Sequence, residues 1–259
     1  MADVTVPWSY IDNYTRTIHG LDEISQELLA DCLYNTDLSN KDAVTALMRS
    51  LCGTSNEAAQ ELATQFYRGF SLMQTGKDMT RRVTSGYSAQ DTDAAVAAIM
   101  ESSGDDEELL GSELGTRLSY EINRASKRGV VRAGKADGRD VRYARVPVGV
   151  ETCAWCIMLA GHGFFYMTEE TASHSHANCD CAIVPSIESA SLSLQGYDPT
   201  VYRDMWRNAA KVLRKGEAPA ELLNRIERAK AHHESKTDKK WSNVNEELIA
   251  MRYFAGLKH

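Results

Sequence analysis

Four of the six cysteines in this chain lie within 29 consecutive positions, and this cluster is the feature that most constrains the fold. They form a CxxC pair, Cys153 and Cys156, and a CxC pair, Cys179 and Cys181. A CxxC spacing in a turn or a first helical turn directs both thiolates towards one tetrahedral ion, and alternate residues of a strand lie on one face. Six cysteines in 259 residues are too few for a disulfide framework. The pattern therefore predicts a small module held together by a metal ion in a reducing compartment.

Zinc is the expected metal, and five side chains compete for its four positions. We predict Cys153, Cys156 and Cys179 as ligands. The fourth ligand is either Cys181 or His176, which lies three residues before the CxC pair. Three or four thiolates leave no open position for water, so we expect a structural ion. Two alternatives remain: metal-free thiols in a small core, and a redox-active CxxC, which the lack of a thioredoxin-like βαβ pattern disfavours.

Signals for helix starts and ends fill the first 128 residues. Asn40 or Ser39 precedes an apolar stripe, and Gly53 is expected to end that helix. Ser55 then starts a second stripe, which Gly76 ends. These two helices are expected to form a hairpin.

Two further helices are expected before residue 129. Ser88 resembles the first residue of a capping box, and Gly104 ends the helix that it starts. Apolar residues recur at three- and four-residue spacing from Leu110 to Ala125, and the acidic run before them suits a helix amino terminus. This last helix is expected to end at Gly129.

From Gly129 onwards the pattern changes to short runs typical of β-strands. The sequence predicts a strand at 130–134, a tight turn at Asp137 and Gly138, and a strand at 139–148. Later segments are expected to form a helix at 154–160, strands at 163–167 and 181–185, and helices near 200–215, 219–233 and 244–254. The predicted fold is α+β and mostly helical, with helical regions at 1–128 and 188–259 flanking a small zinc-bound α+β module at 129–187.

The net charge of −7 is unevenly distributed along the chain. Residues 1–115 contain 19 acidic and 7 basic residues, whereas residues 116–148 contain 3 acidic and 9 basic residues. This basic island is either a solvated surface or a contact surface for nucleic acid or an acidic protein. The arginines that we expect to contact a polyanion, unless they are plain surface charge, are Arg132, Arg139, Arg142 and Arg145.

The usual local signatures of catalysis are missing. The chain has no phosphate-binding glycine loop, no GxSxG and no HExxH, so we expect a protein that is not an enzyme. One alternative is a metal-stabilised nuclease or a transferase-type effector that uses His162, His174 or His176 with the arginines. Another is a zinc-containing DNA-binding module, which the acidic first 115 residues disfavour. No uninterrupted run of 18 apolar residues and no signal peptide are present, so a soluble, unexported chain is expected.

The middle of the chain contains a longer pattern that includes the cysteine pairs. An RVPxG segment is followed by CxxC, a turn of small residues and glycine, an aromatic segment, and HxxCxC before a β-type run and a proline. The residues of this pattern are Arg145, Val146, Pro147, Gly149, Cys153, Cys156, Ala160, Gly161, Gly163, Tyr166, His176, Cys179, Cys181 and Pro185. In order and spacing they resemble the MuF-like minor capsid, or head morphogenesis, proteins of tailed bacteriophages, especially those of actinobacteria.

The resemblance implies a structural component of the virion. Such a protein is present in few copies in the phage head, is assembled in the host cytoplasm and acts in head assembly, DNA packaging or ejection. The implied partners are the portal protein and the major capsid protein, with DNA as a further partner and no membrane. The chain departs from the family at Gly161-His162-Gly163, where relatives tend to have Ser-Arg-Gly. Many relatives carry a long carboxy-terminal extension, which we do not expect in this chain.

Overall fold

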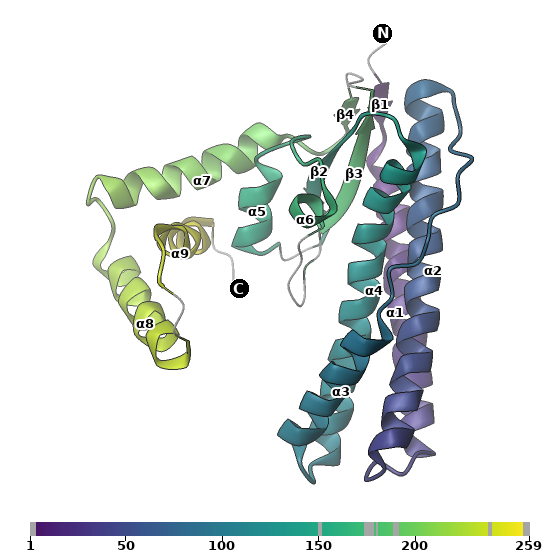
Figure 1. The fold of residues 1–259 in the computed structure, drawn as a ribbon. Coiled ribbons are helices and arrows are strands. Elements are labelled where there is room, and N and C mark those ends of the chain that lie inside the picture. The colour runs from purple at the N-terminus through teal and green to yellow at the C-terminus, as the bar shows by residue number, and fades with distance from the viewer. Residues whose placement is uncertain are drawn as a thin grey trace.

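The computed structural model describes residues 4–149, 152–173, 179, 181–188, 192–237 and 240–255. Four long helices form a rod-like bundle, a two-stranded sheet packs on its upper half, and a group of three helices extends to one side (Figure 1). The predicted class, a mostly helical α+β fold, is confirmed. No helix in the described ranges is long and apolar enough to cross a bilayer.

The bundle consists of α1 (Trp8–Tyr34), α2 (Lys41–Thr75), α3 (Ala89–Ser103) and α4 (Glu107–Asp137). Sequence patterns predicted several of its ends, because the Asn40 side chain caps α2 and the Ser88 side chain caps α3. Its lower half has a core that contains Met48, Leu114, Leu118 and Ile122, all with fully buried side chains. This apolar interior, more than local propensity, holds the four helices together.

The predicted break at Gly53 is wrong, because α2 runs without interruption from Lys41 to Thr75. A glycine inside a helix costs only about 1 kcal/mol relative to alanine, which burial of the flanking turns easily exceeds. A Cβ atom on Gly53 would lie 3.4 Å from the Tyr87 ring, an ordinary van der Waals contact, so the packing at this position neither requires a glycine nor breaks the helix. One long helix therefore replaces the predicted hairpin.

The predicted strand at 130–134 and the turn at Asp137 and Gly138 are also wrong. Helix α4 continues through these residues and ends at Asp137, with Gly138 as its C-cap at a φ of 79°. Gly129 permits close helix packing, since a Cβ atom there would lie 2.7 Å from the Ala63 Cβ atom of α2. The glycine that suggested an end of the helix is thus a contact point between two helices.

Two short sheets complete the centre of the molecule. Strand β2 (Val141–Pro147) pairs antiparallel with β3 (Cys181–Ile187), which confirms strands in both predicted regions. Strand β1 (Val4–Val6) pairs parallel with β4 (Leu192–Leu194). The predicted strand at 163–167 is reduced to one bridge between Tyr166 and Tyr143, and the short helix α6 (Glu169–Ala172) follows it.

Helix α5 (Ala154–Ala160) has the predicted bounds and connects the sheet to the remaining helices. These are α7 (Pro199–Arg214), α8 (Ala220–Lys236) and α9 (Asn243–Ala255), close to their predicted positions. Helix α5 packs against both α7 and α9 and shares an apolar cluster with them. It therefore lies between the centre of the molecule and the helical arm that α7, α8 and α9 form (Figure 1).

Candidate metal centre

Three of the predicted ligands meet in the interior. The sulfurs of Cys156, Cys179 and Cys181 all lie within 4.8 Å of one another, and each of the three residues is buried. The Cys156 and Cys179 sulfurs are 3.5 Å apart. A tetrahedral ion with metal–sulfur bonds of about 2.3 Å holds its sulfurs roughly 3.8 Å apart. The spacing of the three thiols therefore suits a single metal ion.

Cys153 lies at the edge of this group. It is the N-cap residue of α5, and its sulfur accepts a hydrogen bond from the backbone N–H of Cys156 at 3.3 Å. Its half-buried side chain packs against the three buried cysteines. Such N–H···S bonds orient a thiolate for coordination. Cys153 therefore lies beside the group, although the sulfurs that all lie within 4.8 Å of one another are those of Cys156, Cys179 and Cys181.

Different segments deliver the four sulfurs. Cys153 and Cys156 belong to the first turn of α5, whereas Cys181 is the first residue of β3 and lies opposite Pro147 of β2. His176 and His174 lie outside the described residues. The choice of His176 or Cys181 as ligand thus stays a prediction, although the structure does bring Cys181 into the group.

Two buried cations contact the cysteine group. The Arg145 side chain on β2 is fully buried, and it donates hydrogen bonds to the Cys179 sulfur at 3.3 Å and to the Ala172 carbonyl oxygen at 3.1 Å. Lys127 of α4 is 4% exposed and donates to the Cys179 carbonyl oxygen at 2.6 Å. These contacts place two positive charges beside the thiols.

Electrostatics at this centre favour a thiolate. Hydrogen bonds from the two neighbouring thiols lower the pKa of Cys179 most, burial opposes them, and the positive charges of Lys127 and Arg145 lower it further. Burial acts to lower the pKa of the Arg145 guanidinium, but the cysteine charges outweigh it and raise that pKa. The site therefore stabilises a thiolate at Cys179, whereas hydrogen bonds with neighbouring thiols and burial raise the pKa of Cys156, and the pKa of Cys181 is raised as well.

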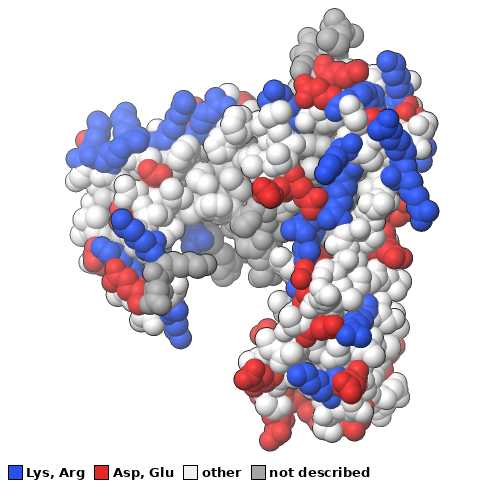
Figure 2. Space-filling model, in the orientation of Figure 1, with Lys and Arg blue, Asp and Glu red and all other residues white. Residues whose placement is uncertain are grey.

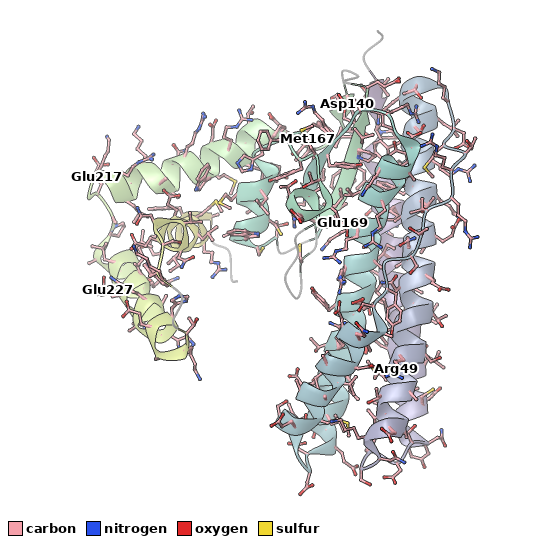
Figure 3. The ribbon with its side chains drawn as sticks, in the orientation of Figure 1. Arg49, Asp140, Met167, Glu169, Glu217 and Glu227 are labelled. Carbon is pink, nitrogen blue, oxygen red and sulfur yellow. The ribbon has the colours of Figure 1, made fainter. Side chains whose placement is uncertain are left out.

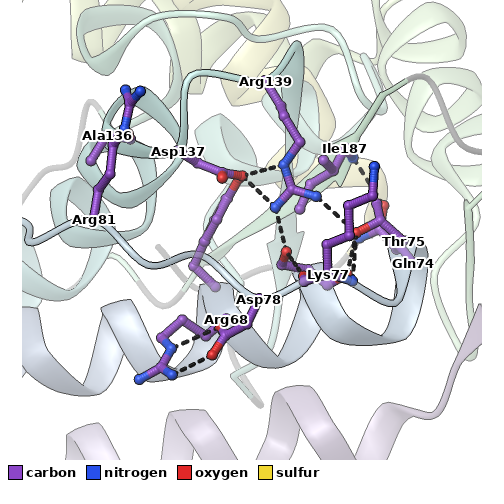
Figure 4. Close-up of polar contacts among 12 residues, drawn as sticks. Arg68, Gln74, Thr75, Lys77, Asp78, Arg81, Ala136, Asp137, Arg139 and Ile187 are labelled. Carbon is purple, nitrogen blue, oxygen red and sulfur yellow. Dashed lines mark hydrogen bonds and ion pairs between the residues drawn. The ribbon is translucent and has the colours of Figure 1, made fainter.

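The prediction that Arg145 contacts a polyanion is wrong, because its side chain is fully buried and directed at the cysteines. Arg139 is also engaged internally (Figure 4). It pairs with Asp137 at 2.6 Å, donates to the Thr75 hydroxyl at 2.8 Å and also donates to the Ser71 hydroxyl. The side chains of Arg139 and Asp137 are only 14% and 8% exposed. Arg139 thus holds the C-terminal end of α4 against the C-terminal end of α2.

The other two predicted arginines differ in environment. Arg132 of α4 makes a bidentate contact with Glu169, the first residue of α6, which Figure 3 labels. Arg142 is half-buried on β2, and among the described residues it has no ion pair. The four arginines therefore do not form one surface. His162, named for the nuclease alternative, contacts the Tyr166 hydroxyl with its Nδ1 at 3.0 Å.

A basic stripe on α7 was not among the predicted contact residues. The exposed side chains of Arg207, Lys211 and Arg214 follow one another at four- and three-residue spacing, which places them on one helix face. Figure 2 shows basic side chains gathered over this helix. Within the described chain none of the three forms an ion pair. The four- and three-residue spacing of these basic residues could have predicted this face from the sequence. The larger excess of basic residues at 116–148 favoured that segment instead.

These features define a helical α+β protein with a buried cysteine centre that can bind a metal ion. The chain belongs to the VG15 protein family, whose family model matches residues 6–209. It is similar to the Gene 15 protein of Mycobacterium phage D29, with 27% identity over 142 residues that cover 40% of this chain and 52% of the relative. The chain thus spans about half the length of that relative. These matches place it among bacteriophage proteins. No solved structure matches it.

The internal role of Arg139 can be tested against Arg142 as a matched control. The Arg139→Met substitution leaves the largely buried Asp137 without its cation, so the free energy of unfolding should fall by about 3 kcal/mol. Arg142→Met removes the same charge from the adjacent strand and should change stability by at most about 0.5 kcal/mol. Denaturant unfolding followed by circular dichroism measures both. Equal effects of the two substitutions would contradict the assignment.

Proposed function

We propose that this protein is a minor capsid protein of a bacteriophage head, a structural virion component that is not an enzyme. The membership in the VG15 family and the similarity to a mycobacteriophage protein support this proposal. The main support for this proposal is the position of the pattern residues in the structure. Arg145, Cys156, Cys179 and Cys181, which belong to the sequence pattern that resembles the MuF-like proteins, converge on one buried centre. Because these residues lie together in the structure, the sequence pattern corresponds to one structural unit. This supports an architecture shared with the MuF-like proteins.

The shape of the molecule suits assembly on larger partners. The bundle and the helical arm present long helices on either side of the central sheet (Figure 1). Exposed apolar side chains on the bundle, such as Ile24, Leu28 and Tyr34, are available for packing. We propose the portal protein and the major capsid protein as partners, with assembly in the host cytoplasm and no membrane involved.

We further propose that the cysteine centre binds structural zinc through Cys153, Cys156, Cys179 and Cys181. Thiolate-rich ligand sets bind zinc in preference to hard cations, and a closed set leaves no position for a reacting water. Bound zinc would link the first turn of α5 to the start of β3. The ion would therefore act on the architecture of the centre.

The zinc proposal predicts about one zinc ion per chain in protein purified without chelator. Removal of the ion should lower the melting temperature, because the binding free energy of a structural ion contributes to folding. Elemental analysis and thermal unfolding with and without chelator measure both quantities. Cys156→Ser should abolish zinc retention, whereas Cys32→Ser, outside the cluster, should leave it unchanged. A wild-type protein with no zinc and no response to chelator would refute the proposal.

The head proposal predicts that the chain is present in purified heads of the phage that encodes it. Quantitative mass spectrometry should find it in few copies relative to the major capsid protein. Chemical cross-linking of intact heads should join it to portal or capsid subunits. A host protein of similar abundance in the lysate provides the control for contamination. Heads that lack the chain would exclude this role.

The stripe of Arg207, Lys211 and Arg214 replaces the four arginines as the proposed polyanion contact, with DNA as the partner. Changing all three to Gln should weaken binding to duplex DNA and reduce the slope of log affinity against log salt by roughly 0.9 for each phosphate that the protein no longer neutralises. Electrophoretic or fluorescence titrations at several salt concentrations measure this slope. The variant with Arg82→Gln and Lys135→Gln, exposed cations elsewhere, should keep the wild-type slope. An unchanged slope in the triple variant, or a reduced slope in the control, would contradict the assignment.

A further inference from the structure

A fully buried arginine and a nearly buried lysine require compensation. Moving a charge out of water costs several kcal/mol unless a partner of opposite sign is close. The sulfur of Cys179 lies 3.3 Å from the Arg145 guanidinium, and the carbonyl oxygen of the same cysteine accepts from Lys127 at 2.6 Å. Both cations therefore converge on one residue of the cysteine group.

The charge of the centre depends on its ligand set. A divalent ion with four thiolates carries a net charge of about −2, whereas three thiolates and one imidazole leave about −1. The two buried cations, Arg145 and Lys127, together carry two positive charges. Of these two ligand sets, the four-thiolate set is the one whose charge the two cations balance.

The position of Cys153 agrees with this balance. It is placed at the start of α5, where its sulfur accepts the Cys156 N–H and packs against the buried thiols. Cys153 is thus held next to the other thiols by a hydrogen bond from the backbone of Cys156.

We propose that Arg145 and Lys127 are positioning residues that neutralise and hold a zinc centre whose four ligands are the thiolates of Cys153, Cys156, Cys179 and Cys181. This inference rests on the proposed zinc site. Arg145 donates directly to the Cys179 sulfur, and it holds the end of α6 through the Ala172 carbonyl oxygen. Lys127 fixes the Cys179 backbone to α4. Together they connect the centre to β2 and to the bundle.

Substitution of Arg145 provides the main test. Arg145→Met should lower the affinity for zinc by about 10- to 100-fold, the usual range for residues that support metal ligands. Arg145→Lys should recover part of the loss, because it restores the charge without the planar donor geometry. Competition with a chromophoric chelator measures the affinities. Arg203→Met is the matched control, since that half-buried arginine donates to the Gly161 carbonyl oxygen and should leave zinc affinity unchanged.

Cobalt substitution separates ligand loss from a general loss of structure. Thiolate-to-cobalt charge-transfer bands report how many sulfurs bind the ion. The wild type and the His176→Ala variant should both show the intensity of four thiolates, whereas Cys153→Ser should show that of three. If Arg145→Met protein does not fold, Lys127→Met should show the same loss of zinc affinity from a different element.

The outcomes are distinguishable from failure of the zinc site itself. Wild-type protein that binds no zinc would remove the metal proposal. Full zinc binding by the wild type, with unchanged affinity in the folded Arg145→Met and Lys127→Met variants, would overturn only the charge-compensation role. Loss of the ion in His176→Ala, with a three-thiolate cobalt spectrum for the wild type, would overturn the four-thiolate assignment.

Discussion

Close packing of α2 against α4 is the interaction on which the other parts of the structure depend. Gly129 has no side chain at the crossing, where a Cβ atom would lie 2.7 Å from that of Ala63, so the two helix backbones approach closely. Gly134, further along α4, likewise leaves room for the Tyr143 hydroxyl of β2. Overpacking at such positions typically costs about 1–3 kcal/mol, which is a large part of the stability of an ordinary domain. Two glycines therefore allow α4 to pack closely against α2 and against Tyr143 of the sheet.

Burial of basic residues is the second constraint, and it explains why a basic island in the sequence does not become a basic surface. Arg139 pairs with Asp137 at the end of α4, Arg132 pairs with Glu169, and Arg145 lies on the cysteines. Each of these interactions joins segments that are far apart in the sequence or holds the C-terminal end of a helix in place. The cost of desolvating an ion is offset only when its partner is held in place, so these arginines depend on the helix packing around them.

Features that depend on neighbouring residues, such as helix caps, could be predicted from the sequence. Features that depend on contacts between distant segments could not. Side-chain caps at Asn40 and Ser88 act within one helical turn, and the bounds of α5 follow from its cysteines and glycine, so these features were predictable. A glycine is ambiguous, because the absence of a side chain permits both a helix end and a close helix contact. Gly129 has the second role, which no local pattern reveals. The side of β2 that Arg145 faces likewise depends on its register with β3, where it lies opposite Ile183.

The orientation of the helical arm depends on the cysteine centre, because α5 contacts both. This helix carries Cys153 and Cys156 at its amino end and packs on α7 and α9 along its length. At its carboxyl end the packing is again close, since a Cβ atom on Gly161 would lie 2.9 Å from the Arg203 backbone nitrogen. Helix α5, seven residues long, therefore joins the helical arm to strand β2 of the central sheet, and its amino end carries two of the cysteines. Seven residues are too few for a stable helix in water, so the orientation of the arm depends on what fixes the first turn of α5.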